Sequence, residues 1–131
     1  MNTNFIVLIV DRNKNIRDFL RREFSAEGYR VKEAVNEHQV LVALGGDPQP
    51  DILICELDMP VDCALSLLEK IRRMELPMPV IIYTSLTDYE EAPICGWADA
   101  FIEKCEDPTL LKNTVTDLLC RKYPNRFNCF N

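Results

Sequence analysis

The stretch Asp51-Ile52-Leu53-Ile54-Cys55-Glu56 decides the fold. Its residues from 52 to 55 are continuously apolar, which is typical of a short strand buried on both faces of a parallel sheet. The stretch ends in an acid, and Pro60 follows shortly after it. Because parallel α/β sheets place their sites at the carboxyl ends of strands, we expect Glu56 to lie at a functional site.

Four more short apolar runs, two before this stretch and two after it, alternate with helical patterns. Strand, helix and strand in alternation predict a parallel sheet with right-handed crossovers and helices on both faces. The chain is therefore expected to be a three-layer α/β/α domain. The other predicted strands are Phe5–Val10, Tyr29–Ala34, Val80–Thr84 and Ala100–Glu103.

Several helix boundaries can be predicted from local signals. Gly28 is expected to end the first helix, and Asn36 with Gln39 resembles a capping box that opens the second. Asp107-Pro108 predicts an N-cap followed by proline at the first helical position. A helix expected between residues 88 and 96 should be short or irregular, because Pro93 removes a backbone donor about one turn in.

Polar residues stand at the carboxyl ends of four of the predicted strands. They are Asp11, Glu56, Thr84 and Lys104, and in a parallel sheet these positions meet at one edge. Two acids, a hydroxyl and an amine at adjoining strand ends form a set that chance rarely assembles. We interpret them as one site rather than as unrelated polar strand ends.

Length and charge limit the function classes. The chain has 131 residues, enough for one domain, and a net charge of -6, which argues against nucleic acid as a direct partner. Its first apolar run, Phe5–Val10, is too short to span a membrane, so we expect a cytoplasmic protein with no membrane contact. The scattered cysteines are expected to be reduced.

Four stretches in order give the chain a family resemblance: LIVDRNKNIRDFL (8–20), PDILICELDMP (50–60), PVIIYTS (79–85) and ADAFIEK (98–104). Together they resemble the receiver domain of response regulators, the CheY-like module of two-component signalling. The resemblance implies a flavodoxin-like fold with a five-stranded parallel sheet in the order 2-1-3-4-5. We expect the receiver domain to cover residues 1–120 and residues 121–131 to form a flexible C-terminal tail.

The resemblance also implies a role for individual residues. Glu56 occupies the phospho-acceptor position, where receivers carry an aspartate. Asp11 matches an acid after the first strand, and Thr84 matches the switch hydroxyl. Lys104 matches the phosphate-binding lysine, and Phe101 matches the aromatic switch position.

The chain departs from the family pattern at several of these positions. Besides Glu56, Arg12 stands where receivers carry a second acid, and Cys105 stands where a proline usually follows the lysine. The charges of Asp11, Glu56, Arg12 and Lys104 cancel, and Asp58 would restore only one acid. Since Mg²⁺ needs carboxylate oxygens, we expect no cofactor, with Mg²⁺ binding weak or absent.

These departures predict a pseudo-receiver, a module that signals by contact and is not switched by phosphorylation. In place of metal and phosphate, Glu56 would pair with Lys104 or with Arg12. One alternative is a receiver phosphorylated at a non-standard site such as Asp58. A less favoured alternative is a redox sensor based on Cys55, Cys63 and Cys105. The spacing of the cysteines does not support this alternative.

The resemblance implies a protein partner rather than a substrate, so we do not expect an enzyme. The partner would be a histidine kinase or a downstream effector. It would bind the face formed by the helix near residues 88–96, the strand Ala100–Glu103 and the last helix. A second copy of the chain could occupy the same face as a homodimer.

Overall fold

The computed structural model describes residues 5–58, 63–85 and 98–126. Its strands form one parallel sheet in the order β2-β1-β3-β4-β5, as expected. The helix expected near residues 88–96 lies outside the described residues. The strands are β1 (Ile6–Val10), β2 (Arg30–Ala34), β3 (Ile52–Cys55), β4 (Val80–Thr84) and β5 (Ala100–Glu103).

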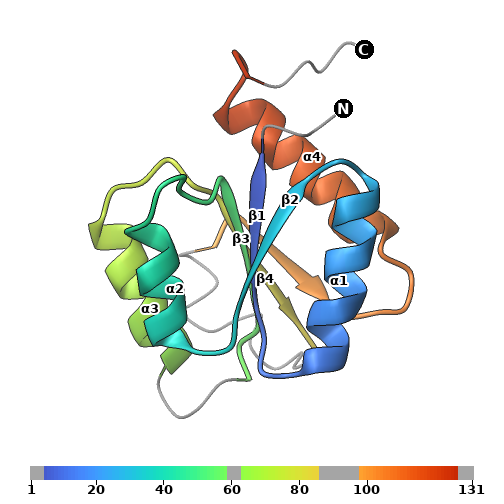
Figure 1. Cartoon of the computed structure of the whole chain (residues 1–131), viewed down its shortest axis with the longest axis horizontal. Helices are drawn as coiled ribbons and strands as arrows, with labels where there is room; N and C mark the ends of the chain where they lie inside the picture. The colour runs from blue at the N-terminus through green and yellow to red at the C-terminus, as the bar shows by residue number, and fades with distance from the viewer. Residues whose placement is uncertain (1–4, 59–62, 86–97, 127–131) are drawn as a thin grey trace.

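Helices cover both faces of this sheet (Figure 1). In the figure α1 and α4 lie on one side and α2 and α3 on the other, so the three-layer prediction is confirmed. The described helices are α1 (Lys14–Ala26), α2 (Glu37–Leu44), α3 (Cys63–Arg73) and α4 (Thr109–Lys122).

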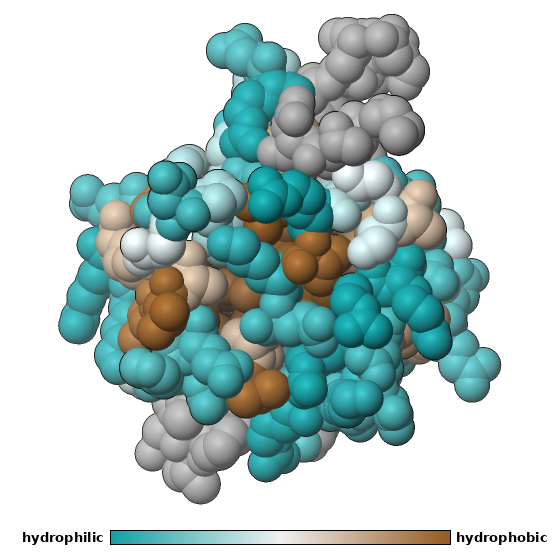
Figure 2. All heavy atoms as spheres, viewed as in Figure 1, coloured by the Kyte–Doolittle hydropathy of each residue, from teal (hydrophilic) through white to brown (hydrophobic). Residues whose placement is uncertain are grey.

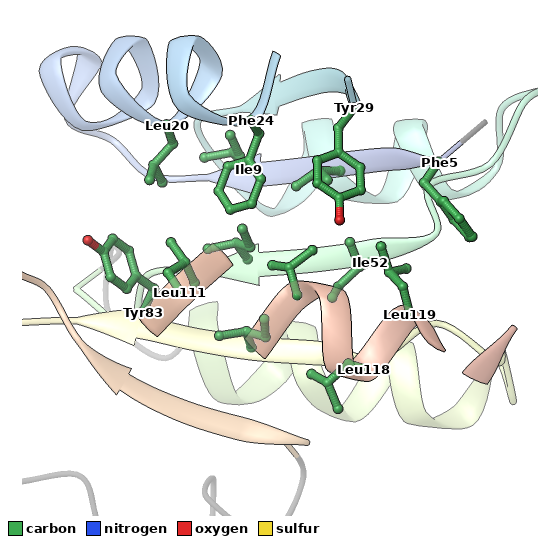
Figure 3. Packing of buried hydrophobic residues seen from close by; sticks show 14 of the residues in the cluster. Phe5, Ile9, Leu20, Phe24, Tyr29, Ile52, Tyr83, Leu111, Leu118 and Leu119 are labelled. Carbon is green, nitrogen blue, oxygen red and sulfur yellow. The ribbon is translucent and has the colours of Figure 1, made fainter. Parts of the chain in front are cut away.

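The core consists of two apolar clusters separated by the sheet. Alternate residues of a strand point to opposite faces, so Leu53 and Cys55 of β3 pack toward α2 and α3, whereas Ile52 and Ile54 pack toward α1 and α4. Figure 3 shows the second cluster, in which Phe24 of α1 lies among side chains from the strands and α4. Burial on both faces explains why β3 is apolar throughout.

Local capping sets most helix boundaries as expected. Gly28 adopts φ 94° just after α1, and Asn36 and Gln39 share the start of α2. There, Asn36 accepts from the Gln39 amide at 2.9 Å, and the Gln39 side chain accepts from the Val35 amide at 2.9 Å. The expected N-cap at residue 107 is shifted by one residue. Pro108 holds the cap position, although the Asp107 carboxylate still accepts from the Thr109 amide at 2.9 Å.

The face of the molecule seen in Figure 2 is predominantly polar. Figure 2 shows hydrophilic residues over most of the visible face, with hydrophobic groups confined to small separate areas. Within the described parts of the chain, no helix is long and apolar enough to cross a membrane.

The end of the described chain is held against the amino edge of the sheet. The Arg126 guanidinium binds the Asp51 carboxylate at 2.7 and 3.2 Å. It also lies over the rings of Phe5 and Tyr123, at 4.6 and 5.0 Å from their centroids. The Tyr123 hydroxyl donates to the Asp51 carbonyl at 3.0 Å, and the Asp51 carboxylate accepts from the Ile6 amide at 2.8 Å.

These contacts lie beyond residue 120, where the domain was expected to end. α4 continues to Lys122, so the expected boundary falls inside this helix. Sequence periodicity gave no signal for the contacts of Tyr123 and Arg126, because aromatic and ionic anchors need no repeating pattern. Residues 127–131 lie outside the described residues.

We expect Arg126→Ala to lower the free energy of unfolding by about 1–2 kcal/mol, measured by urea denaturation. A two-pronged ion pair and two cation–π contacts are lost, and partial exposure of Arg126 reduces their value. Arg121→Ala is the control, because within the described residues Arg121 forms an exposed ion pair with Asp117. It should cost less than about 0.5 kcal/mol. Equal effects of the two substitutions would contradict a specific anchor.

Candidate functional site

The four residues expected to converge do lie at the carboxyl edge of the sheet. Asp11 follows β1, Glu56 follows β3, Thr84 ends β4 and Lys104 follows β5. Asp11, Glu56 and Thr84 are buried, with exposed fractions of 4%, 4% and 0%. Three ionisable groups and a hydroxyl therefore share a site that is largely shielded from water.

Lys104 is the centre of this site. Its ammonium nitrogen Nζ lies 2.7 Å from Asp11 Oδ2 and 2.7 Å from Glu56 Oε1. Its own side chain is only 15% exposed. One cation thus bridges two buried carboxylates, and the three groups carry a single net negative charge. We call Asp11, Glu56 and Lys104 the bridged triad.

The remaining carboxylate oxygens of the bridged triad are also engaged. Asp11 Oδ1 accepts from the Asn13 amide at 2.8 Å, and Glu56 Oε2 accepts from the Leu57 amide at 2.6 Å. The Thr84 hydroxyl donates a further hydrogen bond to the Glu56 carboxylate. Each oxygen of both acids therefore already has a donor from the protein itself.

These bonds control the ionisation of Glu56 and Lys104. Burial by itself would raise the pKa of the Glu56 carboxyl, but hydrogen bonds from Lys104, Thr84 and the Asp58 backbone outweigh burial and hold this pKa below its ordinary value. Burial by itself would lower the pKa of the Lys104 amine, but Asp11 and Glu56 outweigh it and raise this pKa. Both groups are therefore charged at neutral pH.

Arg12 takes no part in the bridged triad. Its guanidinium lies 3.4 Å from Asp58 Oδ1 in an exposed ion pair, with both side chains more than half exposed. Of the two pairings expected for Glu56, the one with Lys104 forms, and Arg12 instead pairs with Asp58. Among the described residues, no group of three or more His, Cys, Asp or Glu side chains is placed to hold a metal ion.

The other expected site residue, Phe101, lies in β5 opposite Ile82 of β4. It is half-buried and packs against the core cluster on the α2 and α3 side of the sheet. Its ring therefore belongs to the packing of this face.

The cysteines differ in burial and in whether they form a disulfide bond. Cys55 is buried, and burial, with the nearby Glu56 and Asp11 charges, raises the pKa of its thiol to about 12. Such a thiol is inert as a nucleophile at neutral pH. Cys105 is a free, exposed thiol, and the side chain of Cys63 lies outside the description. Cys120 is disulfide-bonded, so the expectation of reduced cysteines is wrong at this position.

Sequence reasoning missed Arg17 of α1, which holds the loop that carries Asp11. Its guanidinium donates to the carbonyls of Asp11 at 2.8 Å and Arg12 at 3.0 Å, and Nε lies 3.3 Å from Glu33 Oε1. Because an arginine on an amphipathic helix is usually solvated, its position in the sequence carries no signal of this role.

Comparison with known proteins agrees with this geometry. Residues 7–116 match the family model described as the response regulator receiver domain. The chain belongs to this family. Receiver domains are signalling modules of two-component systems, and the resemblance seen in the sequence is confirmed.

Two relatives are each 31% identical to this receiver domain over the aligned residues. It is 31% identical to the DNA-binding transcriptional regulator NtrC of Proteus hauseri over 125 residues, 91% of this chain and 26% of that protein. It is also 31% identical to the response regulator SaeR of Staphylococcus epidermidis, over 88% of this chain and 50% of that protein. The chain thus spans half or less of the length of these relatives.

Two solved structures superpose on most of this chain. The response regulator TrrA of Thermotoga maritima, in complex with Mg²⁺ and BeF, superposes with a TM-score of 0.81 at 28% identity, covering 88% of this chain and 99% of that one. A receiver domain from Methanospirillum hungatei gives a TM-score of 0.82 at 24% identity, covering 92% and 98%. The second likeness concerns the fold alone.

Lys104→Met should lower the free energy of unfolding at neutral pH by about 3–5 kcal/mol, because two buried acids lose their shared cation. Urea denaturation measures this cost. Lys70→Met is the matched control, since Lys70 Nζ pairs with Glu37 at 3.1 Å but its side chain is 49% exposed. The control should cost less than about 1 kcal/mol. A similar cost for both variants would contradict a buried bridge.

The triad also predicts a dependence of stability on acid pH. The pKa of Glu56 is lowered in the folded state, so its ionised form stabilises the fold fully above the ordinary value of 4.5. This contribution is lost as pH falls through the folded pKa. The stability difference between wild type and Glu56→Gln should therefore be constant near neutral pH and shrink in acid below 4.5. A difference that stays constant throughout the acid range would refute this assignment.

Proposed function

We propose that this receiver domain is a pseudo-receiver, which acts through protein contacts and is not switched by phosphorylation. The observation that carries the proposal is the Lys104 ammonium, 2.7 Å from both Asp11 and Glu56. In this arrangement internal charges take the place of metal and phosphate.

The identity of the acceptor position is the first argument. Glu56 directly follows β3, the buried strand, and matches the position at which receivers carry their phospho-accepting aspartate. One extra methylene displaces the carboxylate by about 1.5 Å. Since in-line attack on a phosphoryl donor already suffers from errors of ~1 Å, glutamate at this position is a poor acceptor.

The engagement of the carboxylate is the second argument. Glu56 Oε1 binds Lys104, and Oε2 binds the Leu57 amide, while Thr84 donates to the same group. A nucleophilic oxygen must give up such bonds before it attacks. The lowered pKa of this carboxyl also makes it a weaker nucleophile. Both effects oppose formation of an acyl phosphate.

The same contacts disfavour a divalent cation. Mg²⁺ requires near-octahedral oxygen ligands and is usually held through one or two carboxylates. Here the oxygens of Asp11 and Glu56 accept from Lys104 and from backbone amides, and Asp58 pairs with Arg12. The donor set does not fit the ion, so we propose that Mg²⁺ binding is weak or absent. No step of the function is assigned to the metal.

A protein is the proposed partner. The structure of histidine kinase ThkA in complex with TrrA contains a receiver that superposes on this chain with a TM-score of 0.78 at 28% identity. We propose that this chain likewise binds a histidine kinase or a downstream effector. The proposed surface includes β5 and α4 together with residues 88–96, which lie outside the description.

Incubation with acetyl phosphate and Mg²⁺, followed by intact mass measurement, tests the proposal. We expect no phosphoryl adduct on the wild-type chain. The double variant Arg12→Asp with Glu56→Asp restores the paired acids and the acceptor typical of the family, and it should gain one phosphoryl group. Arg12→Asp alone is the control and should stay unmodified.

The location of any adduct decides between the remaining functions. A phosphoryl group mapped to Glu56 of the wild type would overturn the pseudo-receiver. One mapped to Asp58 would instead support a receiver with a non-standard acceptor. Labelling of the double variant shows that the reagents and the scaffold are competent.

A further inference from the structure

The loop that carries Lys104 is fastened to β4 at two points. The Lys104 amide donates to the Thr84 carbonyl at 2.9 Å, and one residue later the Tyr83 hydroxyl donates to the Cys105 carbonyl at 3.2 Å. The second contact is a side-chain bond from a neighbouring strand to the carbonyl of the residue that directly follows the bridging lysine. This bond is therefore well placed to control the backbone position from which the Lys104 side chain extends.

Tyr83 is built into the core on the opposite side of β4 from Ile82. The residue is 3% exposed and belongs to the cluster that α1 and α4 cover. Figure 3 shows its ring beside Leu111, with its hydroxyl directed away from the other labelled side chains. Burial raises the pKa of this phenol, so the hydroxyl keeps its proton and acts as a donor at neutral pH.

On its far side the loop is fastened to the start of α4. The Cys105 thiol donates to the Asp107 carbonyl at 3.0 Å, and the Asp107 carboxylate accepts from the Thr109 amide and hydroxyl. These bonds hold the loop to the helix. The position of the loop relative to β4 is set by the two other contacts, those of the Tyr83 hydroxyl and the Lys104 amide.

We propose that Tyr83 is a positioning residue, whose hydroxyl fixes the carbonyl of Cys105, the residue after Lys104, and so places the ammonium between Glu56 and Asp11. Cys105 stands where the family usually has a proline, whose ring would stiffen this point of the loop. In this chain the hydrogen bond from the Tyr83 hydroxyl of β4 restrains the same point of the loop. The positioning role of Tyr83 rests on the proposed function in one respect: the signalling role of the bridged triad comes from that proposal.

Tyr83→Phe tests this role, because it removes the hydroxyl and keeps the ring. The carboxyl carbon of Glu56 is titrated by ¹³C NMR, and the reactivity of the Lys104 amine is measured by competitive acetylation at neutral pH. In the variant we expect the Glu56 midpoint to rise toward 4.5 and Lys104 to acetylate several-fold faster. A residue that only fills space would leave both readouts unchanged.

Tyr29→Phe is the matched control. Tyr29 is also a buried tyrosine of the same cluster, but its hydroxyl lies 3.5 Å from Thr116 of α4, away from the lysine loop. This control should titrate and acetylate like wild type. Equal shifts in both variants, or none in Tyr83→Phe, would overturn the proposal.

Two further measures keep the outcome interpretable. Thermal unfolding verifies that each variant is folded, and Tyr83→Met serves as a second hydroxyl-free variant if Tyr83→Phe does not fold. Phosphorylation of wild-type Glu56 would overturn the proposed pseudo-receiver but would leave the role of Tyr83 untouched. Unchanged Glu56 and Lys104 readouts would overturn the positioning role alone.

Discussion

The Lys104 ammonium shared between Asp11 and Glu56 is the interaction on which the carboxyl edge of the sheet depends. It joins the loops after β1, β3 and β5, and its partners lie 93 and 48 positions away along the chain. Burying two acids and a base costs desolvation free energy, which these short bonds must offset. Removal of Lys104 would leave two buried acids without their shared cation, so both carboxylates depend on this one side chain.

A second ion pair holds the opposite edge. Asp51 directly precedes β3 and binds Arg126, whereas Glu56 directly follows β3 and binds Lys104. The central strand is thus restrained at both of its ends by contacts with segments distant in sequence. Such a scaffold suits a module that presents one fixed surface to its partner, in keeping with the proposed function.

Much of the fold was predictable because its signals are local. Continuous apolar runs such as Ile52–Cys55 indicate buried strands, and the Asn36–Gln39 pair indicates a helix start through bonds within a few residues. One error in these local predictions was a shift by a single residue. The cap expected at Asp107 moved to Pro108, although the Asp107 side chain kept its bond to the Thr109 amide.

By itself, the sequence determined that a parallel sheet forms and that Asp11, Glu56, Thr84 and Lys104 reach its carboxyl edge, because strand periodicity and strand order suffice for both. Only the tertiary structure decided that Lys104, and not Arg12, pairs with Glu56. That choice depends on loop paths, which are set by long-range contacts such as the bond from the Tyr83 hydroxyl to the loop after Lys104. Such contacts have no sequence period, since each joins residues that only the finished fold brings together.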